Sequence, residues 1–274
     1  MSGRARPVSP TVIPKKQQAT HEQFVAAMAN IEQLVPRREF DDLLDATVSD
    51  VRRTLLTSRG AVPRYAWSGG KDSMALQLVM ERAAVRECVL GMTDLEYPEF
   101  LRWVTQHMPD GLTVINTGLD LEWLERHPQM LFPRDADTAS RWFALIQHRA
   151  QDRYVRAERA TILILGRRAA DGNFMGRDGS GLYQKPDGCW RYSPLQHWRH
   201  EDVLAACHYY GYPLAPNYGW PRGYRVGTGA WPARQWTRSP EHGWDEIWQI
   251  DPDIVRAATI ARIPGAFACE LRHV

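Results

Sequence analysis

Residues 64–79 read RYAWSGGKDSMALQLV and place the run SGGKDS between a short apolar segment and an amphipathic one. This order predicts a strand, a tight turn and a helix. The turn would expose backbone N–H groups at the positive end of the helix dipole, and Gly69 and Gly70 would let a ligand approach the main chain closely. Two serine hydroxyls and the ammonium group of Lys71 add donors and charge. We therefore predict a phosphate-binding turn. A plain strand-to-helix turn with an incidental lysine is the alternative.

Composition limits the classes of protein that need to be considered. The chain has 274 residues, 44% of them hydrophobic and 24% charged, and a net charge of +2. These values are typical of a soluble globular protein and do not indicate a nucleic-acid or membrane partner. The four cysteines lack CxxC spacing, and no apolar segment follows the N-terminal arginines. We therefore expect a cytoplasmic protein without disulfides or a membrane partner.

The order of patterns along the chain predicts an α/β fold. Apolar segments at 61–67, 87–92, 112–116 and 161–166 alternate with segments of helical spacing. Such alternation predicts a mostly parallel sheet, which we expect to have five strands, with helices on both faces. We divide the chain into a flexible arm (1–20), N-terminal helices (21–60), a nucleotide-binding domain (61–218) and an extension rich in Trp and Arg (219–274). After Asn217 we expect a largely irregular segment, with a final helix at 252–262.

The SGGKDS run after an apolar strand resembles the PP-loop of the ATP pyrophosphatases, whose fold is adenine nucleotide α-hydrolase-like. The Walker A spacing is absent. Two further segments resemble the phosphoadenosine-phosphosulfate (PAPS) reductase family within that superfamily: MTDLEYPEF at 92–100 and LGRRAADGNFMGR at 165–177. The family's Pro-Leu…Trp…Asp-Val segment is matched at 194–203. Met92, Asp94, Asp171 and Gly172 depart from the residues usual at their positions.

The resemblance implies a site for ATP or a PAPS-type adenine nucleotide, with Mg²⁺ as its companion and chemistry at the α-phosphate that releases pyrophosphate. It implies Lys71, Asp72 and Arg168 as catalytic residues, and Asp72 would cap the following helix or organise Mg²⁺. No residue is assigned as a direct metal ligand. The implied nucleotide-binding residues are Ser68, Gly69, Gly70, Lys71, Asp72, Ser73, Asp94, Glu96, Gly166, Arg168 and Arg177.

Two other functions stay open from the sequence. One is a thioredoxin-coupled PAPS reductase that uses Cys269, because CELRH at 269–273 resembles the reductases' C-terminal Glu-Cys-Gly-Leu-His motif. The paired cysteines of the cluster-dependent relatives are missing, so we expect no iron–sulfur cluster. The other is a non-catalytic nucleotide-sensing protein. It would bind nucleic acid or a partner protein through residues 220–248, where tryptophans and arginines alternate. We prefer a structural role for these aromatic residues, with a lid over the substrate as an intermediate case. The acceptor substrate and any homo-oligomer are left open.

Overall fold

A computed structural model describes residues 20–58 and 60–274 of the chain. The predicted flexible arm therefore lies outside the described residues, apart from Thr20. The described strands form one sheet in the order β3-β2-β1-β4-β6-β5, in which only the β5–β6 pair is antiparallel. The strands are β1 (Pro63–Ala66), β2 (Cys88–Met92), β3 (Leu112–Asn116), β4 (Ile162–Ile164), β5 (Leu182–Gln184) and β6 (Trp190–Tyr192).

The α/β prediction is confirmed, with one difference in the number of strands. We expected five, and the described part of the chain has six because a short hairpin, β5–β6, adds to the edge beside β4. All three residues of β4 are buried. This burial agrees with its uninterrupted apolar sequence, which is typical of a strand covered on both faces.

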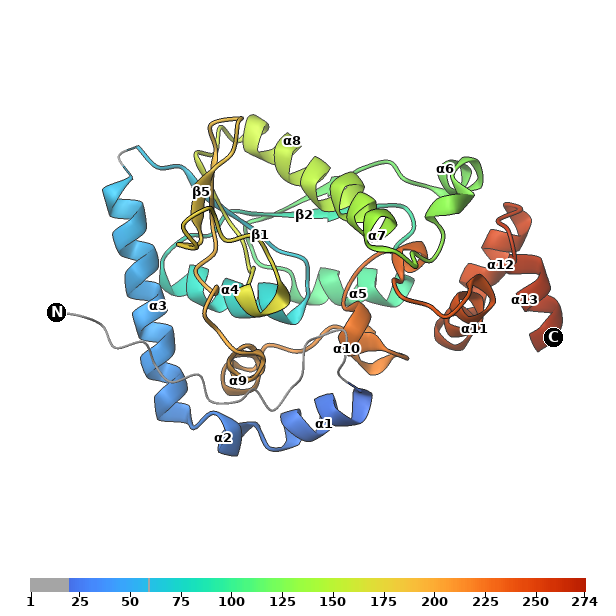
Figure 1. Ribbon diagram of the computed structural model, residues 1–274, viewed down its shortest axis with the longest axis horizontal. Coiled ribbons are helices and arrows are strands. Elements are labelled where there is room, and N and C mark those ends of the chain that lie inside the picture. Colours follow the sequence, from blue (N-terminus) through green and yellow to red (C-terminus); the bar gives the residue numbers. More distant parts are fainter. Residues whose placement is uncertain (1–19, 59) are drawn as a thin grey trace.

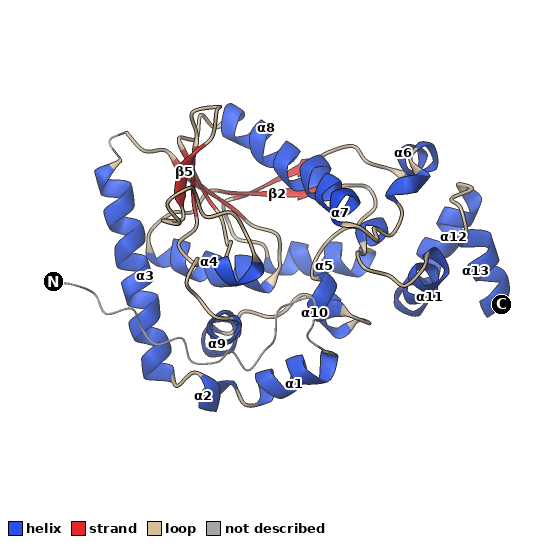
Figure 2. Cartoon of the chain, viewed as in Figure 1, coloured by secondary structure: helices blue, strands red, loops and turns tan. Residues whose placement is uncertain are grey.

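Helices cover the sheet on both sides, as Figures 1 and 2 show. α4 and α5 lie on one face, α7 and α8 lie on the other, and α9 packs against the outer side of α4. The helices in this core are α4 (Lys71–Arg82), α5 (Pro98–His107), α6 (Leu121–Arg126), α7 (Ala136–Phe143), α8 (Arg149–Ala157) and α9 (His200–Tyr210), with a π-helical segment η2 (Ala144–His148) and 3-10 turns η1 (Pro128–Met130), η3 (Ala169–Asp171) and η4 (Pro216–Gly219).

The N-terminal helices follow the prediction from helical spacing. Thr20 and Gln23 form a capping box that begins the first helix, which explains why the helix starts where the polar arm ends. The longest helix buries Phe40, Leu44 and Val48 at intervals of four residues. Their bounds are α1 (His21–Ala29), α2 (Ile31–Leu34) and α3 (Arg37–Thr57).

The C-terminal extension is more helical than predicted. Ser239 caps a helix whose first residue is Pro240, and a further helix follows residue 265. The expectation of an irregular segment up to Trp248 is therefore wrong from residue 240 onward. Serine followed by proline is a helix-start signal that the high density of Gly and Trp had outweighed. The elements are α10 (Gly223–Val226), η5 (Trp231–Ala233), α11 (Pro240–Ile250), α12 (Pro252–Ile260) and α13 (Ala266–His273).

None of the helices in the described ranges combines the length and the apolar character that crossing a bilayer requires.

Candidate functional site

The strand order places a crevice at the carboxyl ends of β1 and β4. The chain runs outward from β1 through β2 to β3 and then returns to the other side of β1 as β4. Open parallel sheets bind ligands where the direction of the strand order reverses in this way. A cavity of about 590 Å³ opens at this point, between Ser68 after β1 and Gly166 after β4.

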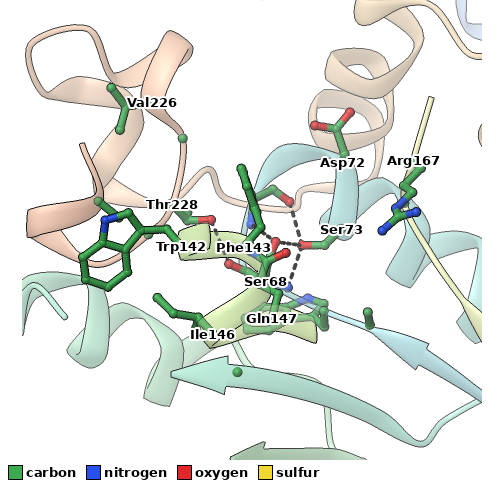
Figure 3. Close-up of a pocket in the computed structure, with 18 of the residues that line it drawn as sticks. Ser68, Asp72, Ser73, Trp142, Phe143, Ile146, Gln147, Arg167, Val226 and Thr228 are labelled. Carbon is green, nitrogen blue, oxygen red and sulfur yellow. Dashed lines mark hydrogen bonds between the residues drawn. The ribbon is translucent and has the colours of Figure 1, made fainter. Parts of the chain in front are cut away.

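The turn after β1 is held by its two serines. The Ser68 backbone N–H donates to Ser73 Oγ (3.1 Å), and Ser73 Oγ donates to the Gly70 carbonyl (2.8 Å), as the dashed lines in Figure 3 mark. Gly69 has φ +67°, and a Cβ there would lie 2.8 Å from Trp103. Only glycine fits this position. Helix α4 then begins after Gly70, which has no side chain to cap it.

A segment from the C-terminal extension covers the turn. Residues 225–230 line the cavity together with Ala233, Gln235 and Trp236, and we call residues 225–236 the cover segment. Thr228 Oγ1 donates to the Ser68 carbonyl (2.9 Å), and Figure 3 shows the two residues side by side. The Tyr218 hydroxyl, which precedes this segment, accepts from the Lys71 backbone N–H (2.8 Å). The aromatic extension thus lies over the carboxyl ends of the strands, where the cavity opens.

Lys71 and Arg168 are buried behind the turn and do not belong to the cavity lining. Both side chains have 0% exposure, and both bind Asp72: Lys71 Nζ lies 2.8 Å from Oδ2, and Arg168 Nε lies 2.7 Å from Oδ1. Arg168 also pairs with Asp171 (2.8 Å). Of this group, Asp72 and Asp171 reach the cavity wall. The predicted capping role of Asp72 is not seen, because the N-cap of α4 is Gly70. The Asp72 carboxylate binds Lys71 and Arg168 instead.

Two arginines that the sequence analysis did not select line the cavity directly. Arg167 follows β4, lies on the wall opposite the cover segment in Figure 3, and donates to the Tyr183 hydroxyl (3.0 Å). Arg225 lies at the start of the cover segment and is exposed. Guanidinium groups bind phosphate oxygens in bidentate geometry. Arg167 neighbours the motif arginine Arg168, which the sequence analysis selected and which lies behind the turn.

Glu96 lies in the cavity wall at the start of α5. Its Oε1 accepts from the backbone N–H and the hydroxyl of Thr93, both at 3.2 Å. Within the described residues, the buried Oε2 atom has no hydrogen-bond partner. Burial raises the pKa of the Glu96 carboxyl to about 7.

The other predicted residues divide between the cavity and the surface. Ser68, Gly70, Ser73 and Gly166 line the cavity. Asp94 is exposed and accepts a hydrogen bond from Asn116, the last residue of the edge strand β3, so it turns toward the edge of the sheet. Arg177 is exposed in the loop before β5 and is not part of the cavity lining.

The opposite wall comes from α7 and the π-helical segment η2. Trp142, Phe143, Ile146 and Gln147 face the cavity there, and Figure 3 shows them beside the serine turn. π-Helical turns inside α-helices are frequent at functional sites. With Trp236 from the cover segment, this wall is aromatic and apolar, whereas the wall at the strand ends is polar. The cavity therefore suits a ligand with an aromatic part and an anionic part.

Cys269 lies in α13, in the group of C-terminal helices at the far end of the molecule in Figure 1, and does not line the cavity. Its side chain has 0% exposure. Burial, followed by the negative charge of Asp245, raises the pKa of its thiol to about 11. These surroundings disfavour the thiolate that a reductase needs.

No family model and no curated protein matches the chain. Similar solved structures include a PAPS reductase from Candida auris in a phosphate complex, with 14% identity over 72% of this chain and 96% of that one and a TM-score of 0.49. Another is Candida glabrata FMN adenylyltransferase in complex with ATP (12%, 77% and 69%, TM-score 0.45). A third is the U34-tRNA thiolase NcsA from Methanococcus maripaludis with its [4Fe-4S] cluster (13%, 98% and 87%, TM-score 0.38).

One prediction is overturned by these comparisons. We excluded an iron–sulfur cluster because the sequence lacks paired cysteines, but the similar NcsA structure contains a [4Fe-4S] cluster. Cysteine spacing is a poor basis for this exclusion, because cluster ligands can come from elements that are distant in sequence.

Proposed function

We propose that the protein binds an adenine nucleotide in the cavity at the ends of β1 and β4 and catalyses displacement at its α-phosphate, with release of pyrophosphate. The observation behind this proposal is the turn at 68–73, which opens into that cavity at the N-terminus of α4. The proposal keeps the nucleotide predicted from the sequence and changes the residues that hold its phosphates.

The phosphates would lie between the serine turn and two guanidinium groups. Ser68, Gly70 and Ser73 of the turn line the cavity, while Arg167 and Arg225 approach from two other segments of the wall. Positive charge placed around the β- and γ-phosphates would stabilise pyrophosphate as it leaves. Because Lys71 and Arg168 neutralise Asp72 behind the turn, they would act by keeping that carboxylate from repelling the phosphates.

Asp72 and Asp171 do not form a ready magnesium site. Both oxygens of Asp72 are bound by cations, and Asp171 is paired with Arg168. Mg²⁺ prefers free carboxylate oxygens and water in octahedral geometry. These residues therefore fit ion pairs better than a bound metal.

The adenine ring of the nucleotide would lie against the aromatic wall. Trp236 is 43% exposed, lines the cavity and has φ +63°, an unfavourable conformation for tryptophan. Its backbone N–H donates to the Pro133 carbonyl (2.7 Å), which holds this conformation. Together with Phe143, it offers an aromatic face for stacking.

The test is to incubate the purified protein with labelled ATP and MgCl₂ and separate the products. We expect AMP and pyrophosphate, whereas a reaction at the γ-phosphate would give ADP and phosphate. ATP affinity, measured by calorimetry, should fall about 10- to 100-fold in Arg167→Ala and Arg225→Ala, by analogy with other charge-assisted contacts. Arg38→Ala is the control, because Arg38 is exposed on α3. Equal affinity in all three variants would refute the phosphate site.

Neither alternative function is favoured by an observation at this site. Cys269 is remote from the cavity and buried, which speaks against a cysteine-based reductase. In the aromatic extension, Trp231 and Trp244 belong to the core, and Arg222 and Arg234 bind Glu246. Most of the groups proposed for nucleic-acid binding are thus used inside the protein.

A further inference from the structure

Glu96 differs from the other acidic residues of the cavity in having a free oxygen. The side chain is 8% exposed, Thr93 holds Oε1 in place, and Oε2 is buried with no partner among the described residues. Asp72 and Asp171, by contrast, bind cations. Leaving a polar atom buried and unpaired destabilises a protein, so an unpaired oxygen in a cavity wall calls for an explanation.

The cover segment places Glu96 near the serine turn. Thr228 Oγ1 binds the carbonyl of Ser68, and the backbone N–H of Trp231 donates to the carbonyl of Leu95 (3.0 Å). Three residues of chain span at most about 10 Å. Glu96 follows Leu95 directly, so it lies within roughly the length of a nucleotide from the turn that would hold the phosphates.

The charges around Glu96 leave its free oxygen available for a substrate. Its neighbour Tyr97 lies 3.5 Å from Arg234, which in turn binds Glu246. The η2 segment contributes the neutral Gln147, and the cavity's own arginines, Arg167 and Arg225, come from the β4 end and the cover segment. No hydrogen bond within the described structure joins either of these arginines to Glu96.

We propose that Glu96 is the general base of the reaction and that the acceptor substrate is a nucleophile with a removable proton, such as a hydroxyl, an amine or water. This inference rests on the proposed function. The acceptor oxygen or nitrogen forms a bond to the α-phosphorus, the bond from that phosphorus to the bridging oxygen breaks, and pyrophosphate leaves with the electron pair. The acceptor's proton passes to Glu96 Oε2.

This role selects among classes of acceptor. A carboxylate or sulfate acceptor is already an anion and attacks without losing a proton, so it needs no base. The raised pKa of Glu96, about 7, suits a group that accepts a proton near neutral pH. Glu96 would be a catalytic residue. A general base at this position would argue against carboxylates and sulfate as the main acceptors.

The experiment measures ATP cleavage to AMP and pyrophosphate, with water as acceptor, between pH 5 and pH 9. In the wild type, kcat/KM should rise with pH and level off above about pH 7. Glu96→Gln should lower the rate about 10²- to 10⁴-fold and abolish this rise, while the Kd for ATP changes less than about threefold. Added formate should partly restore the rate of ATP cleavage in Glu96→Ala. It should not do so in Glu96→Gln, because the glutamine side chain still fills the space that formate would occupy. Glu87→Gln is the control, because Glu87 is exposed and precedes β2 at its opposite end.

The outcomes separate this inference from the function on which it rests. A wild-type protein that fails to bind ATP refutes the proposed function itself. If the wild type binds ATP normally, two results refute the general base. One is a Glu96→Gln variant that keeps the wild-type rate and pH profile, and the other is a wild type that forms no AMP at any pH. A Glu96→Gln variant that loses ATP affinity in parallel with its rate also refutes it, because Glu96 would then be a binding residue.

Discussion

Arg168 Nε lies 2.7 Å from Asp72 Oδ1, joining the segment after β4 to the first turn of α4 across 96 residues of sequence. The guanidinium group is fully buried, whereas Asp72 reaches the cavity. The turn at 68–73 is thus held from behind by an ion pair, and its other side faces the cavity.

Replacing Arg168 should test this support. Arg168→Met leaves Asp72 and Asp171 without a shared cation, and removing one partner of a buried ion pair costs about 3–5 kcal/mol. Arg177→Met is the control from the same sequence segment, and because Arg177 is exposed we expect a change within about 0.5 kcal/mol. Urea denaturation measures both values. Equal stability of the two variants would contradict the buried ion pair.

Gly69 should not tolerate a β-carbon. Gly69→Ala combines φ +67° with a contact of 2.8 Å to Trp103, so we expect a loss of more than about 2 kcal/mol in unfolding free energy and weaker ATP binding. Gly118→Ala is the matched control, because Gly118 has φ +75° with nothing within 4 Å of the added carbon. It should show only the conformational cost, about 1 kcal/mol. If Gly69→Ala costs no more than Gly118→Ala, the close contact with Trp103 is not real.

Glu96 should make folding stability depend on pH. Its pKa is raised from 4.5 to about 7 in the folded protein, so its protonated form favours folding. This contribution is full below pH 4.5 and is lost as the pH rises to about 7. The loss amounts to about 3 kcal/mol at most. Thermal unfolding of Glu96→Gln should therefore vary less between pH 5 and pH 8 than that of the wild type, and parallel curves would show that burial does not perturb this carboxyl.

The contact between the cover segment and the turn should be measurable by hydrogen exchange. Thr228→Val keeps the side-chain shape and removes the hydrogen bond to the Ser68 carbonyl. We expect a loss of about 1 kcal/mol and faster amide exchange confined to residues 225–236. Thr105→Val is the control, because Thr105 is exposed and its hydroxyl binds only its own helix at the Leu101 carbonyl. Unchanged exchange in Thr228→Val would mean that the hydrogen bond does not hold the segment.

Cys269 should be unreactive in the native protein. Its thiol is buried and its pKa is raised to about 11, so at pH 7 we expect alkylation by iodoacetamide to become rapid only after unfolding. Cys269→Ser should leave pyrophosphate release unchanged. Rapid labelling of the native protein at this residue, found by mass spectrometry, would reopen the reductase.

Much of this protein is determined by short stretches of its sequence. The turn at 68–73, the alternation of strands and helices and the apolar character of β4 depend on backbone conformation and on the periodicity of neighbouring residues, which a sequence contains directly. The sequence therefore predicted the sheet and the position of the turn between β1 and α4. It also pointed to Ser68, Ser73, Glu96 and Gly166, which lie at strand ends or in the turns that follow them.

Tertiary structure alone decided which charges face the cavity. Lys71 and Arg168 turn inward because Asp72 binds both of them, while Arg167 and Arg225 reach the cavity from segments nearly 60 residues apart in sequence. Local patterns do not encode the direction of a side chain at the end of a strand or helix, because packing against distant elements sets it. For the same reason, only the folded chain reveals the hydrogen bond from Thr228 to the turn and the unpaired oxygen of Glu96.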